Sequence, residues 1–342
     1  MIEPLGQGSV DPLSKRFDAA LVDLDGVLYV GRSAVEGAPE AVQAARRAGM
    51  RVAFVTNNAS RTPEVVAEHL TELGIAAVAA DVVTSAQAAA TLVAELVPPG
   101  SRVLVVGGAG LEEALKERGL RPVWSADDEP DAVVQGFAPD VGWRQLTEGA
   151  LAVRAGLPWV ASNLDLTVPT PRGPAPGNGT LVGVVARATG SFPLAAGKPE
   201  LPLHREAVRR TGSERPLVVG DRLDTDIEGG NRAGVPTLLV LTGITTPLDV
   251  VMAEPSHRPT WVAETLPDGL LRPHPPVVRR GGTWSCGGWD CRLGDGVIHV
   301  AGAGPRIDAL RALSVAAWST GAPLTRHAVA VLDGRPLPSV AG

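Results

Sequence analysis

The chain has 342 residues, of which 44% are hydrophobic and 20% charged, and its formal net charge is -6. This composition is typical of a globular protein with a hydrophobic core, long enough for two or three domains of roughly 150 residues each. It lacks the basic surplus of nucleic-acid-binding proteins, contains no apolar run of about 18 residues that could span a membrane, and begins without a signal-peptide pattern. Two cysteines argue against a disulfide framework, so we expect a cytoplasmic protein with neither nucleic-acid nor membrane partners.

The first predicted strand covers residues 19–22, where four apolar residues lead directly into Asp23-Leu24-Asp25-Gly26. An uninterrupted apolar run is typical of a strand that is buried on both faces of a parallel α/β sheet. Because strand side chains repeat with period two, Asp23 and Asp25 leave the backbone in similar directions. Ligands of such sheets bind beyond the carboxyl ends of the strands, so this pair could hold a metal cation or divide two proton-transfer roles.

The α/β alternation continues along the first quarter of the chain. A helix is predicted over residues 36–48, and a second buried strand over residues 51–56 ends in Thr56-Asn57-Asn58. Another helix follows from Ser60 to Gly74. This β-α-β-α order implies a parallel sheet with right-handed crossovers.

The same α/β alternation extends from about Asp81 to Gly190, and we interpret this region as an inserted domain. It contains predicted strands near residues 102–106, 132–136 and 159–161, a helix over 143–155 and a Pro/Gly-rich loop over 169–179. Gly107-Gly108-Ala109-Gly110 follows the first of these strands. Glu113 stands where a dinucleotide-binding fingerprint needs its last glycine, so we interpret these glycines as a tight strand-to-helix turn.

After the insert, the alternation of strands and helices that began the chain continues. Gly197-Lys198-Pro199 precedes a predicted helix over residues 202–211, and a buried strand over 216–220 ends in Asp221. A last strand is predicted over 236–240, and the four prolines of residues 267–276 indicate a linker. Between these elements lie Asp226 and two further acidic residues that we interpret as solvated charges, Asp224 and Glu228.

The C-terminal 66 residues, 277–342, predict a small appendage with a strand pair between Trp284 and Val300 and a helix over 306–319. Cys286 and Cys291 are spaced like half of a zinc site, but the sequence holds no second pair, so we expect reduced structural cysteines. Gly302-Ala303-Gly304 before the helix is similar to an acyl-CoA phosphate loop, although the segment is too short for a complete acetyltransferase.

Four motifs, each at a strand end or a helix start, occur in the order that resembles the haloacid-dehalogenase-like (HAD) phosphohydrolases. They are Asp23-x-Asp25-Gly26, Thr56 after an apolar strand, Lys198, and Gly220-Asp221-x4-Asp226. The residues within these motifs are similar to those of the NagD and p-nitrophenylphosphatase branch, and this resemblance covers residues 17–271. The chain also resembles actinobacterial glycerol 3-phosphate phosphatases. A calcium-binding loop is excluded, because Leu28 stands where such a loop needs glycine and Ala34 where it needs glutamate.

The resemblance implies a fold with a Rossmann-like parallel-sheet core, an inserted α/β cap domain and a small α+β C-terminal appendage. We assign the discontinuous core to residues 1–86 and 190–271, the cap to 87–189, and a linker with the appendage to 272–342. Such a cap closes over the active site, excludes water and sets the specificity for the leaving group. A homodimer formed through the cap is a further expectation.

The resemblance also implies an Mg2+-dependent phosphatase that works through an aspartyl phosphate. Asp23 is the expected nucleophile and Asp25 the expected general acid and base. The implied metal ligands are Asp23, the backbone carbonyl of Asp25, and Asp221. We expect Asp226 to support either the metal or Lys198.

A second group of residues is expected to bind the phosphoryl oxygens. These are Lys198, Thr56 and the backbone donors of Asn57 and Asn58. Asp165, which lies in the implied cap, could accept hydrogen bonds from substrate hydroxyls, and the equally weighted alternative is a turn or helix-capping aspartate.

The expected substrate is a small phosphorylated metabolite, with glycerol 3-phosphate first and 2-phosphoglycolate, nucleoside monophosphates or sugar phosphates next. A phosphomutase, a carbon-halogen hydrolase and a non-catalytic phosphate-binding module are the alternatives. Halide chemistry has no leaving alcohol to protonate and no need for a metal, so Asp25 and Asp221 count against it. The intact set of acidic and basic residues counts against a non-catalytic module.

Overall fold

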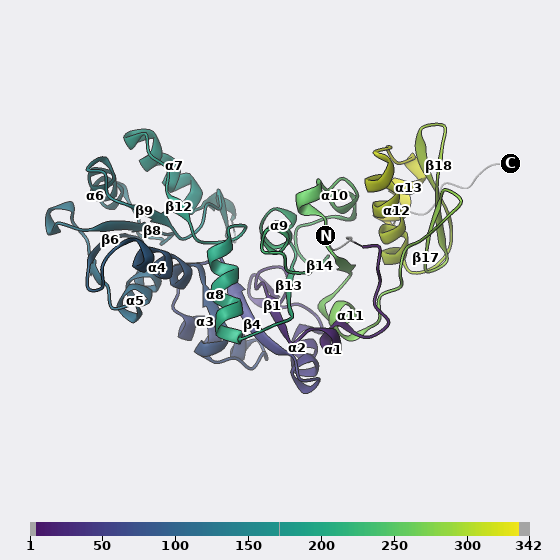
Figure 1. Ribbon diagram of the computed structural model, residues 1–342, viewed down its shortest axis with the longest axis horizontal. Coiled ribbons are helices and arrows are strands. Elements are labelled where there is room, and N and C mark those ends of the chain that lie inside the picture. Colours follow the sequence, from purple (N-terminus) through teal and green to yellow (C-terminus); the bar gives the residue numbers. More distant parts are fainter. Residues whose placement is uncertain (1–4, 171, 335–342) are drawn as a thin grey trace. The chain divides into compact units, whose positions relative to one another are not determined.

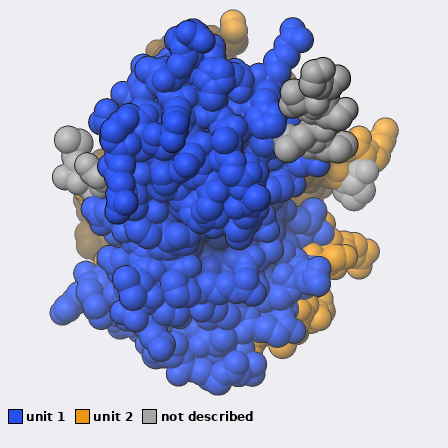
Figure 2. Space-filling model, turned by 90° about the vertical axis from the view of Figure 1, so that its right-hand side faces the viewer, with its two compact units in different colours: residues 1–30, 34–52, 213–342 blue, residues 31–33, 53–212 orange. Residues whose placement is uncertain are grey.

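The computed structural model describes residues 5–170 and 172–334, and the chain forms two compact units. The first unit consists of residues 1–30, 34–52 and 213–342, and the second of residues 31–33 and 53–212. Figure 2 shows the first unit in blue and the second in orange. No helix in the described part of the chain has the length and apolar character needed to cross a membrane.

A parallel sheet with strand order β15-β14-β13-β1 forms the centre of the first unit (Figure 1). Its strands are β1 (Ala19–Val22), β13 (Pro216–Gly220), β14 (Thr237–Val240) and β15 (Trp261–Ala263). All four residues of β1 are buried, which confirms the strand type predicted from its apolar run. Val22 pairs with Val219, so the polar segments that follow β1 and β13 leave the sheet at the same edge.

Short helices and strands connect the strands of this sheet. They are α1 (Leu13–Arg16), β2 (Tyr29–Val30), β3 (Ser33–Ala34), α2 (Ala38–Arg47), the π-helix Leu223–Ile227, α9 (Glu228–Arg232), α10 (Pro247–Val251), the 3-10 helix Pro255–His257 and α11 (Leu266–Leu271). The prediction of a linker over residues 267–276 is wrong in its first half, where α11 forms. Thr265 caps this helix by accepting from the Asp268 N–H, and Leu266 and Leu270 are buried.

The C-terminal part of the first unit is an antiparallel sheet with strand order β16-β17-β18-β19 beside two helices (Figure 1). The elements are β16 (Val278–Arg280), β17 (Thr283–Cys286), β18 (Trp289–Gly294), β19 (Val297–Gly302), α12 (Arg306–Thr320) and α13 (Arg326–Asp333). The predicted strand pair is therefore wrong in number. Trp284 of β17 and Leu313 of α12 belong to the same buried hydrophobic cluster as Leu239 and Val262, so the appendage shares a core with the parallel sheet.

A buried arginine adds polar contacts between the appendage and β15. Arg311 donates hydrogen bonds to the Val262 carbonyl at 2.7 Å and to His274 Nδ1 at 3.2 Å, and it pairs with Asp308 at 2.5 Å. His274 Nε2 must be the donor in its 2.8 Å contact with the Gly269 carbonyl, because a carbonyl only accepts. Burial, together with the Arg311 charge, lowers the pKa of His274 from 6.5 to about 4.

The second unit contains a five-stranded parallel sheet with strand order β12-β9-β8-β6-β7. Its strands are β6 (Arg102–Val106), β7 (Arg121–Val123), β8 (Ala132–Gln135), β9 (Trp159–Ala161) and β12 (Leu194–Ala195). The pair β4 (Arg51–Thr56) and β5 (Val82–Thr84) is also parallel, and β4 enters this unit at Ala53. These results confirm the parallel α/β pattern predicted for the insert.

Six α-helices accompany these strands among the residues of this unit that the structure describes. They are α3 (Pro63–Glu72), α4 (Ser85–Leu96), α5 (Ala109–Glu117), α6 (Trp143–Arg154), α7 (Asn178–Thr189) and α8 (Leu201–Thr211), with 3-10 turns at Ala79–Asp81 and Ala126–Asp128. Helices α6 and α7 lie on one face of the five-stranded sheet, and α4 and α5 lie on the other (Figure 1).

The prediction of a loop over residues 169–179 is wrong. Strands β10 (Thr167–Thr170) and β11 (Gly173–Pro176) form an antiparallel hairpin there, and α7 begins at Asn178. Pro169 and Pro174 lie opposite each other in this pair. A two-stranded hairpin consists only of edge strands, and edge strands tolerate residues that lack a backbone N–H.

The low pKa of His274 predicts a pH-dependent stability. The unfolded chain binds this proton near pH 6.5, whereas the folded protein binds it only near pH 4. The contribution of neutral His274 to the free energy of unfolding is thus complete above pH 6.5 and is lost as the pH falls towards 4, by at most about 3 kcal/mol. Urea unfolding across this range should show a smaller pH dependence for His274→Gln than for the wild type. His299 is exposed, so His299→Gln is the control and should show the same pH dependence as the wild type. The prediction is contradicted if the free energy of unfolding changes equally with pH in all three proteins.

Candidate active site

Three carboxylates of the first unit converge beyond the carboxyl ends of β1 and β13. One oxygen from each of Asp23, Asp221 and Asp226 lies within 4.8 Å of the other two. Asp221 and Asp226 are buried, and Asp23 is half-buried. Ionised carboxylates this close repel one another unless a cation or a proton lies among them. Because Mg2+ prefers oxygen ligands, this group of residues fits a hard divalent cation.

The backbone after β1 explains how Asp23 is placed. The Asp23 N–H donates to the Val219 carbonyl at 2.8 Å and so extends the pairing of β1 with β13. Gly26 has a φ of +81°, and a Cβ at this position would lie 2.5 Å from Asp221 Oδ2. Glycine is therefore needed here both for the left-handed backbone and for the close approach of Asp221. The Asp25 side chain is exposed and is not part of the three-carboxylate cluster.

Asp226 is held beside the other two carboxylates by its own turn. Its Oδ2 accepts from the Arg222 N–H at 3.1 Å, and Gly220 packs directly against its side chain. The sequence predicted a supporting role for Asp226 at either the metal or Lys198. Its place in the carboxylate cluster favours the metal, and the role itself stays a prediction.

Of the two neighbouring acidic residues that were predicted to be solvated charges, Asp224 is exposed as predicted, whereas Glu228 is half-buried. Asp224 forms an ion pair with Arg222 at 2.8 Å, and Glu228 pairs with Arg232 at 2.6 Å and with His257 at 3.1 Å. Partial burial would raise the pKa of the Asp224 carboxyl, but the hydrogen bonds and charge of Arg222 outweigh it and lower that pKa. These pairs brace the segment that carries Asp226.

Sequence reasoning missed the loop over residues 242–245, which follows β14. Thr242 Oγ1 donates to the Gly26 carbonyl at 2.6 Å, and the Ile244 N–H donates to Asp221 Oδ2 at 2.9 Å. The loop therefore ties the turn after β1 to the carboxylate after β13. Its signal was available, because this polar segment directly follows a buried apolar strand and so belongs at the same edge of the sheet.

The end of β4 carries a separate polar group in the second unit. Thr56 is buried, and its Oγ1 accepts from the Asn58 N–H at 3.0 Å. The hydroxyl proton of Thr56 can therefore point to another acceptor, while the Asn58 N–H, a predicted phosphate donor, is used in this contact. Asn58 Oδ1 accepts from the N–H and Oγ of Ser60 at 2.8 and 2.7 Å, which fixes the turn.

Lys198 is also buried, and its ammonium group donates to the Val55 carbonyl at 3.2 Å. Asn57 holds the backbone of Lys198, since its Oδ1 accepts from the Lys198 N–H at 2.8 Å and its Nδ2 donates to the Lys198 carbonyl at 3.1 Å. The same Nδ2 donates to Asp165 Oδ2 at 3.1 Å. The second unit thus brings together three residues that the sequence proposed separately.

The glycines of Gly107–Gly110 pack tightly within the second unit. A Cβ at Gly110 would collide with the Ala59 carbonyl oxygen, and a Cβ at Gly107 would lie 2.6 Å from the side chain of Leu111. This close packing confirms the predicted tight strand-to-helix turn.

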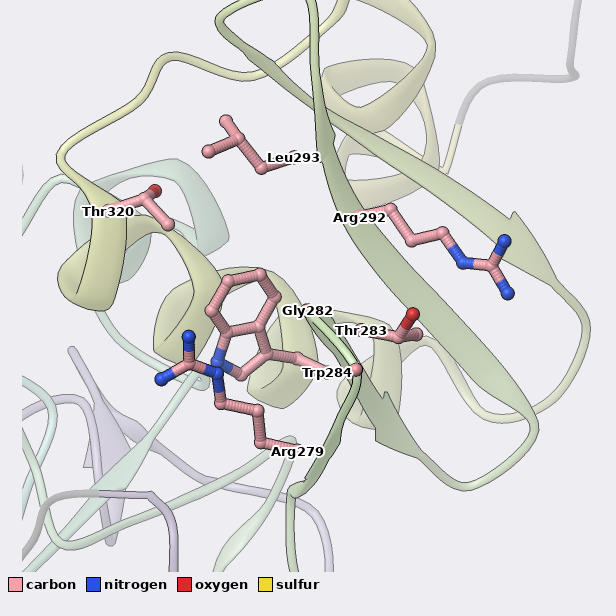
Figure 3. A pocket seen from close by; sticks show the side chains of 8 residues that line it. Arg279, Gly282, Thr283, Trp284, Arg292, Leu293 and Thr320 are labelled. Carbon is pink, nitrogen blue, oxygen red and sulfur yellow. The ribbon is translucent and has the colours of Figure 1, made fainter.

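The appendage has a cavity of about 550 Å³ outside the carboxylate cluster (Figure 3). Its lining includes Trp284, Leu293 and Thr320, and the Arg279 guanidinium lies 5.0 Å from the centre of the Trp284 ring. Arg292 also contributes to the lining, but Figure 3 shows its side chain pointing away from that of Arg279. The two arginines do not converge on a common anion.

The two cysteines of the appendage are free and buried. Burial raises the pKa of both thiols, Cys286 and Cys291, to about 12. A thiol with such a pKa is neither a nucleophile nor a ready metal ligand at neutral pH. The prediction of reduced structural cysteines is confirmed.

Comparison with known proteins identifies the family. Residues 20–121 match the haloacid dehalogenase-like hydrolase family, and residues 195–269 match the HAD-hydrolase-like family. Residues 286–334 match the GCN5-related N-acetyltransferase like domain, in the segment where the sequence resembles an acyl-CoA loop. The chain belongs to the haloacid dehalogenase-like hydrolases.

Its relatives narrow this class. The D-glycerol 3-phosphate phosphatase of Mycobacterium tuberculosis is 44% identical over 343 residues, which cover 96% of this chain and 92% of that protein. The crystal structure of the glycerol phosphate phosphatase from the same organism in complex with magnesium matches with a TM-score of 0.86 and 42% identity, covering 96% of this chain and 100% of that one.

Two further relatives match over a smaller share of the chain. An acid sugar phosphatase of Staphylococcus aureus is 40% identical over 238 residues, covering 69% of this chain and 91% of that protein. A p-nitrophenyl phosphatase from Archaeoglobus fulgidus matches with a TM-score of 0.68 and 30% identity, covering 74% and 97% of the two chains. The predicted class, a phosphoric monoester hydrolase of the NagD and p-nitrophenylphosphatase type, is confirmed.

The loop after β14 yields a test of the metal site. A Cβ at Gly243 would collide with the Asp221 carboxylate, so Gly243→Ala must displace this predicted ligand. We expect a 10- to 100-fold weaker Mg2+ affinity by titration calorimetry, roughly the effect of altering a group that orients a metal ligand. Gly183→Ala is the matched control, because a Cβ at Gly183 meets nothing within 4 Å. Equal affinities in the two variants would contradict this assignment.

Proposed function

We propose that this hydrolase is an Mg2+-dependent phosphatase of small phosphate monoesters, with D-glycerol 3-phosphate as its substrate. The observation that carries the proposal is the cluster of Asp23, Asp221 and Asp226, whose oxygens lie within 4.8 Å of one another at the end of β1. The 44% identical relative is named for this substrate and matches over 96% of the chain, including the appendage. Alternative substrates for the same mechanism are 2-phosphoglycolate, nucleoside monophosphates and sugar phosphates; the relative from S. aureus is an acid sugar phosphatase.

The proposed metal ligands are Asp23, Asp221 and the backbone carbonyl of Asp25, with Asp226 in support. When bound, Mg2+ supplies positive charge that offsets the repulsion between an anionic nucleophile and an anionic ester. The magnesium complex of the M. tuberculosis enzyme supports this choice of cation.

Asp23 is the proposed nucleophile. Its carboxylate oxygen bonds to phosphorus while the bond between phosphorus and the leaving alcohol oxygen breaks, which gives an aspartyl phosphate. Asp25 donates a proton to the leaving oxygen and then takes one from the water that attacks the intermediate. Hydrolysis returns Asp23 as a carboxylate and releases inorganic phosphate.

The proposed phosphoryl donors are the Thr56 hydroxyl, the Lys198 ammonium group and the backbone N–H groups of Asn57 and Asn58. The Asn58 N–H, which donates to Thr56 Oγ1 at 3.0 Å, would exchange that contact for one with a phosphoryl oxygen. Lys198 is suited to this role because the Val55 carbonyl already holds its buried ammonium group at 3.2 Å. A donor fixed before the reaction needs little reorganisation as charge develops on the phosphoryl oxygens. Asp165 is proposed to accept from hydroxyl groups of the leaving alcohol.

The wider organisation is also a proposal. We place the core at residues 1–86 and 190–271, the cap at 87–189, and the linker and appendage at 272–342, in a cytoplasmic protein. Trp143 and Leu166 are 79% and 68% exposed, and large exposed apolar side chains often mark contact surfaces. We therefore propose a homodimer that forms through the cap.

The substrate proposal is tested by phosphate release from a panel of monoesters, with and without Mg2+. We expect turnover only with Mg2+ and the highest kcat/KM for D-glycerol 3-phosphate. The same panel with 2-phosphoglycolate, a nucleoside monophosphate and a sugar phosphate ranks the alternatives. No release from any ester would contradict the proposed function.

The nucleophile is tested by Asp23→Asn, which keeps the side-chain shape but removes the attacking carboxylate. We expect kcat to fall at least about 1,000-fold, as in other enzymes that lose their nucleophile. Asp224→Asn is the control, because Asp224 pairs with Arg222 and lies outside the carboxylate cluster. Phosphatase assays and circular dichroism of both variants check activity and folding. Wild-type turnover by Asp23→Asn would exclude Asp23 as nucleophile.

The dimer is tested by sedimentation velocity. A wild-type dimer should dissociate when Trp143→Glu and Leu166→Glu place charges on the proposed contact surface. Val10→Glu is the control, since Val10 is 91% exposed but lies outside the proposed cap. A monomeric wild type would contradict the proposal.

A further inference from the structure

We infer that Asn57 is a positioning residue that couples Lys198 to Asp165, so that binding of the phosphoryl group and contact with the leaving alcohol are set together. The inference rests on the phosphatase function proposed above and on contacts within the second unit. Asn57 follows Thr56 directly, and no role was predicted for its side chain. The structure shows that this side chain, and not only the backbone, is engaged with two other site residues.

The side-chain amide of Asn57 bridges two separate segments. Its Oδ1 accepts from the Lys198 N–H at 2.8 Å, while its Nδ2 donates to the Lys198 carbonyl at 3.1 Å and to Asp165 Oδ2 at 3.1 Å. A Cβ at Gly197 would lie only 2.6 Å from Asn57 Oδ1, so the chain can approach this closely because residue 197 is glycine.

The main chain of Asn57 is also tied to the Asp165 loop. Its carbonyl accepts from Ser85 Oγ at 2.6 Å and from Asn163 Nδ2 at 2.7 Å. Asn163 Oδ1 accepts from the Asp165 N–H at 3.1 Å. Asp165 is therefore connected to Asn57 twice, once through its carboxylate and once through its backbone.

The helix that follows extends this chain of amides. Asn178 begins α7, is 1% exposed, and donates through Nδ2 to the Asn163 carbonyl at 2.7 Å. Asn163 itself is 4% exposed. Neutral amides can donate and accept at once, so they satisfy buried backbone groups on several segments without adding charge beside a phosphate site.

An amide is the side chain that this position requires. Aspartate has the same shape, but it cannot donate to the Lys198 carbonyl, and its charge would repel Asp165. The coupling has a consequence for specificity. An oriented carboxylate at Asp165 can accept from the hydroxyl groups of a polyol phosphate, whereas the leaving group of p-nitrophenyl phosphate has no hydroxyl to offer.

A double-mutant cycle with two substrates tests the inference. Asn57→Ala, Asp165→Ala and the double variant are assayed with D-glycerol 3-phosphate and with p-nitrophenyl phosphate. We expect Asn57→Ala to lower kcat/KM at least tenfold for both substrates, because Lys198 loses two backbone hydrogen bonds. Asp165→Ala should lower kcat/KM at least fivefold more for D-glycerol 3-phosphate than for p-nitrophenyl phosphate.

The double variant gives the decisive comparison. For D-glycerol 3-phosphate its loss should be at least threefold smaller than the product of the single losses, because Asp165 acts only when Asn57 orients it. For p-nitrophenyl phosphate the single losses should multiply. A merely structural role for Asn57 would lower both activities without this dependence on substrate.

Asn231→Ala is the matched control. Asn231 also donates two side-chain hydrogen bonds to backbone carbonyls, those of Ser256 at 2.8 Å and Arg258 at 3.0 Å, but in the first unit and outside the carboxylate cluster. This variant should lose thermal stability, while the ratio of the two kcat/KM values stays at the wild-type value. Asn57→Asp keeps the side-chain shape and should also lose at least tenfold in kcat/KM.

Multiplicative losses for D-glycerol 3-phosphate, or wild-type kcat/KM in Asn57→Asp, would overturn the inference while the wild type remains a phosphatase. A wild type that hydrolyses neither substrate with Mg2+ would overturn the proposed function and this inference with it. The wild-type assay therefore separates the two failures.

Discussion

The mutual repulsion of three carboxylates is the constraint on which the first unit depends. Asp23, Asp221 and Asp226 present oxygens within 4.8 Å of one another, partly out of water, and such a group is stable only with positive charge or a proton among them. The protein brings them together with backbone. The β1–β13 pairing aligns two strand ends, and Gly26, Gly220 and Gly243 leave out the side chains that would push the carboxylates apart.

The second unit contains a buried group of the opposite charge, the ammonium group of Lys198. The buried Lys198 ammonium group needs hydrogen-bond acceptors, and the Val55 carbonyl is one of them. Asn57 holds the backbone on either side of this lysine with a neutral amide. A cation that is correctly placed before the ester arrives is what binding of an anionic ester requires. Both units thus hold charged groups with uncharged backbone and amide contacts.

The local sequence pattern predicted many of the strands and helices and the three carboxylate residues. The apolar run of β1 is buried as expected, and the predicted helix over 143–155 matches α6 closely, because burial and helix periodicity are local signals. Asp23, Asp221 and Asp226 were recognised because each motif follows a strand or turn at the same sheet edge. The contacts that hold them were not, since Thr242 and Gly26 meet only through the fold. Two wrong predictions came from composition. Because both segments are rich in proline, a loop was predicted where the β10–β11 hairpin forms and a linker where α11 forms.

The most direct test of the central claim, that Asp23 carries the phosphoryl group during turnover, is to trap the intermediate. The wild-type enzyme is quenched during hydrolysis of D-glycerol 3-phosphate and treated with borohydride, which reduces an aspartyl phosphate to homoserine. Mass spectrometry of the peptides then locates the modified residue. The account predicts homoserine at position 23 in the presence of Mg2+. Homoserine at another aspartate, or phosphate release with no trapped residue, would contradict it.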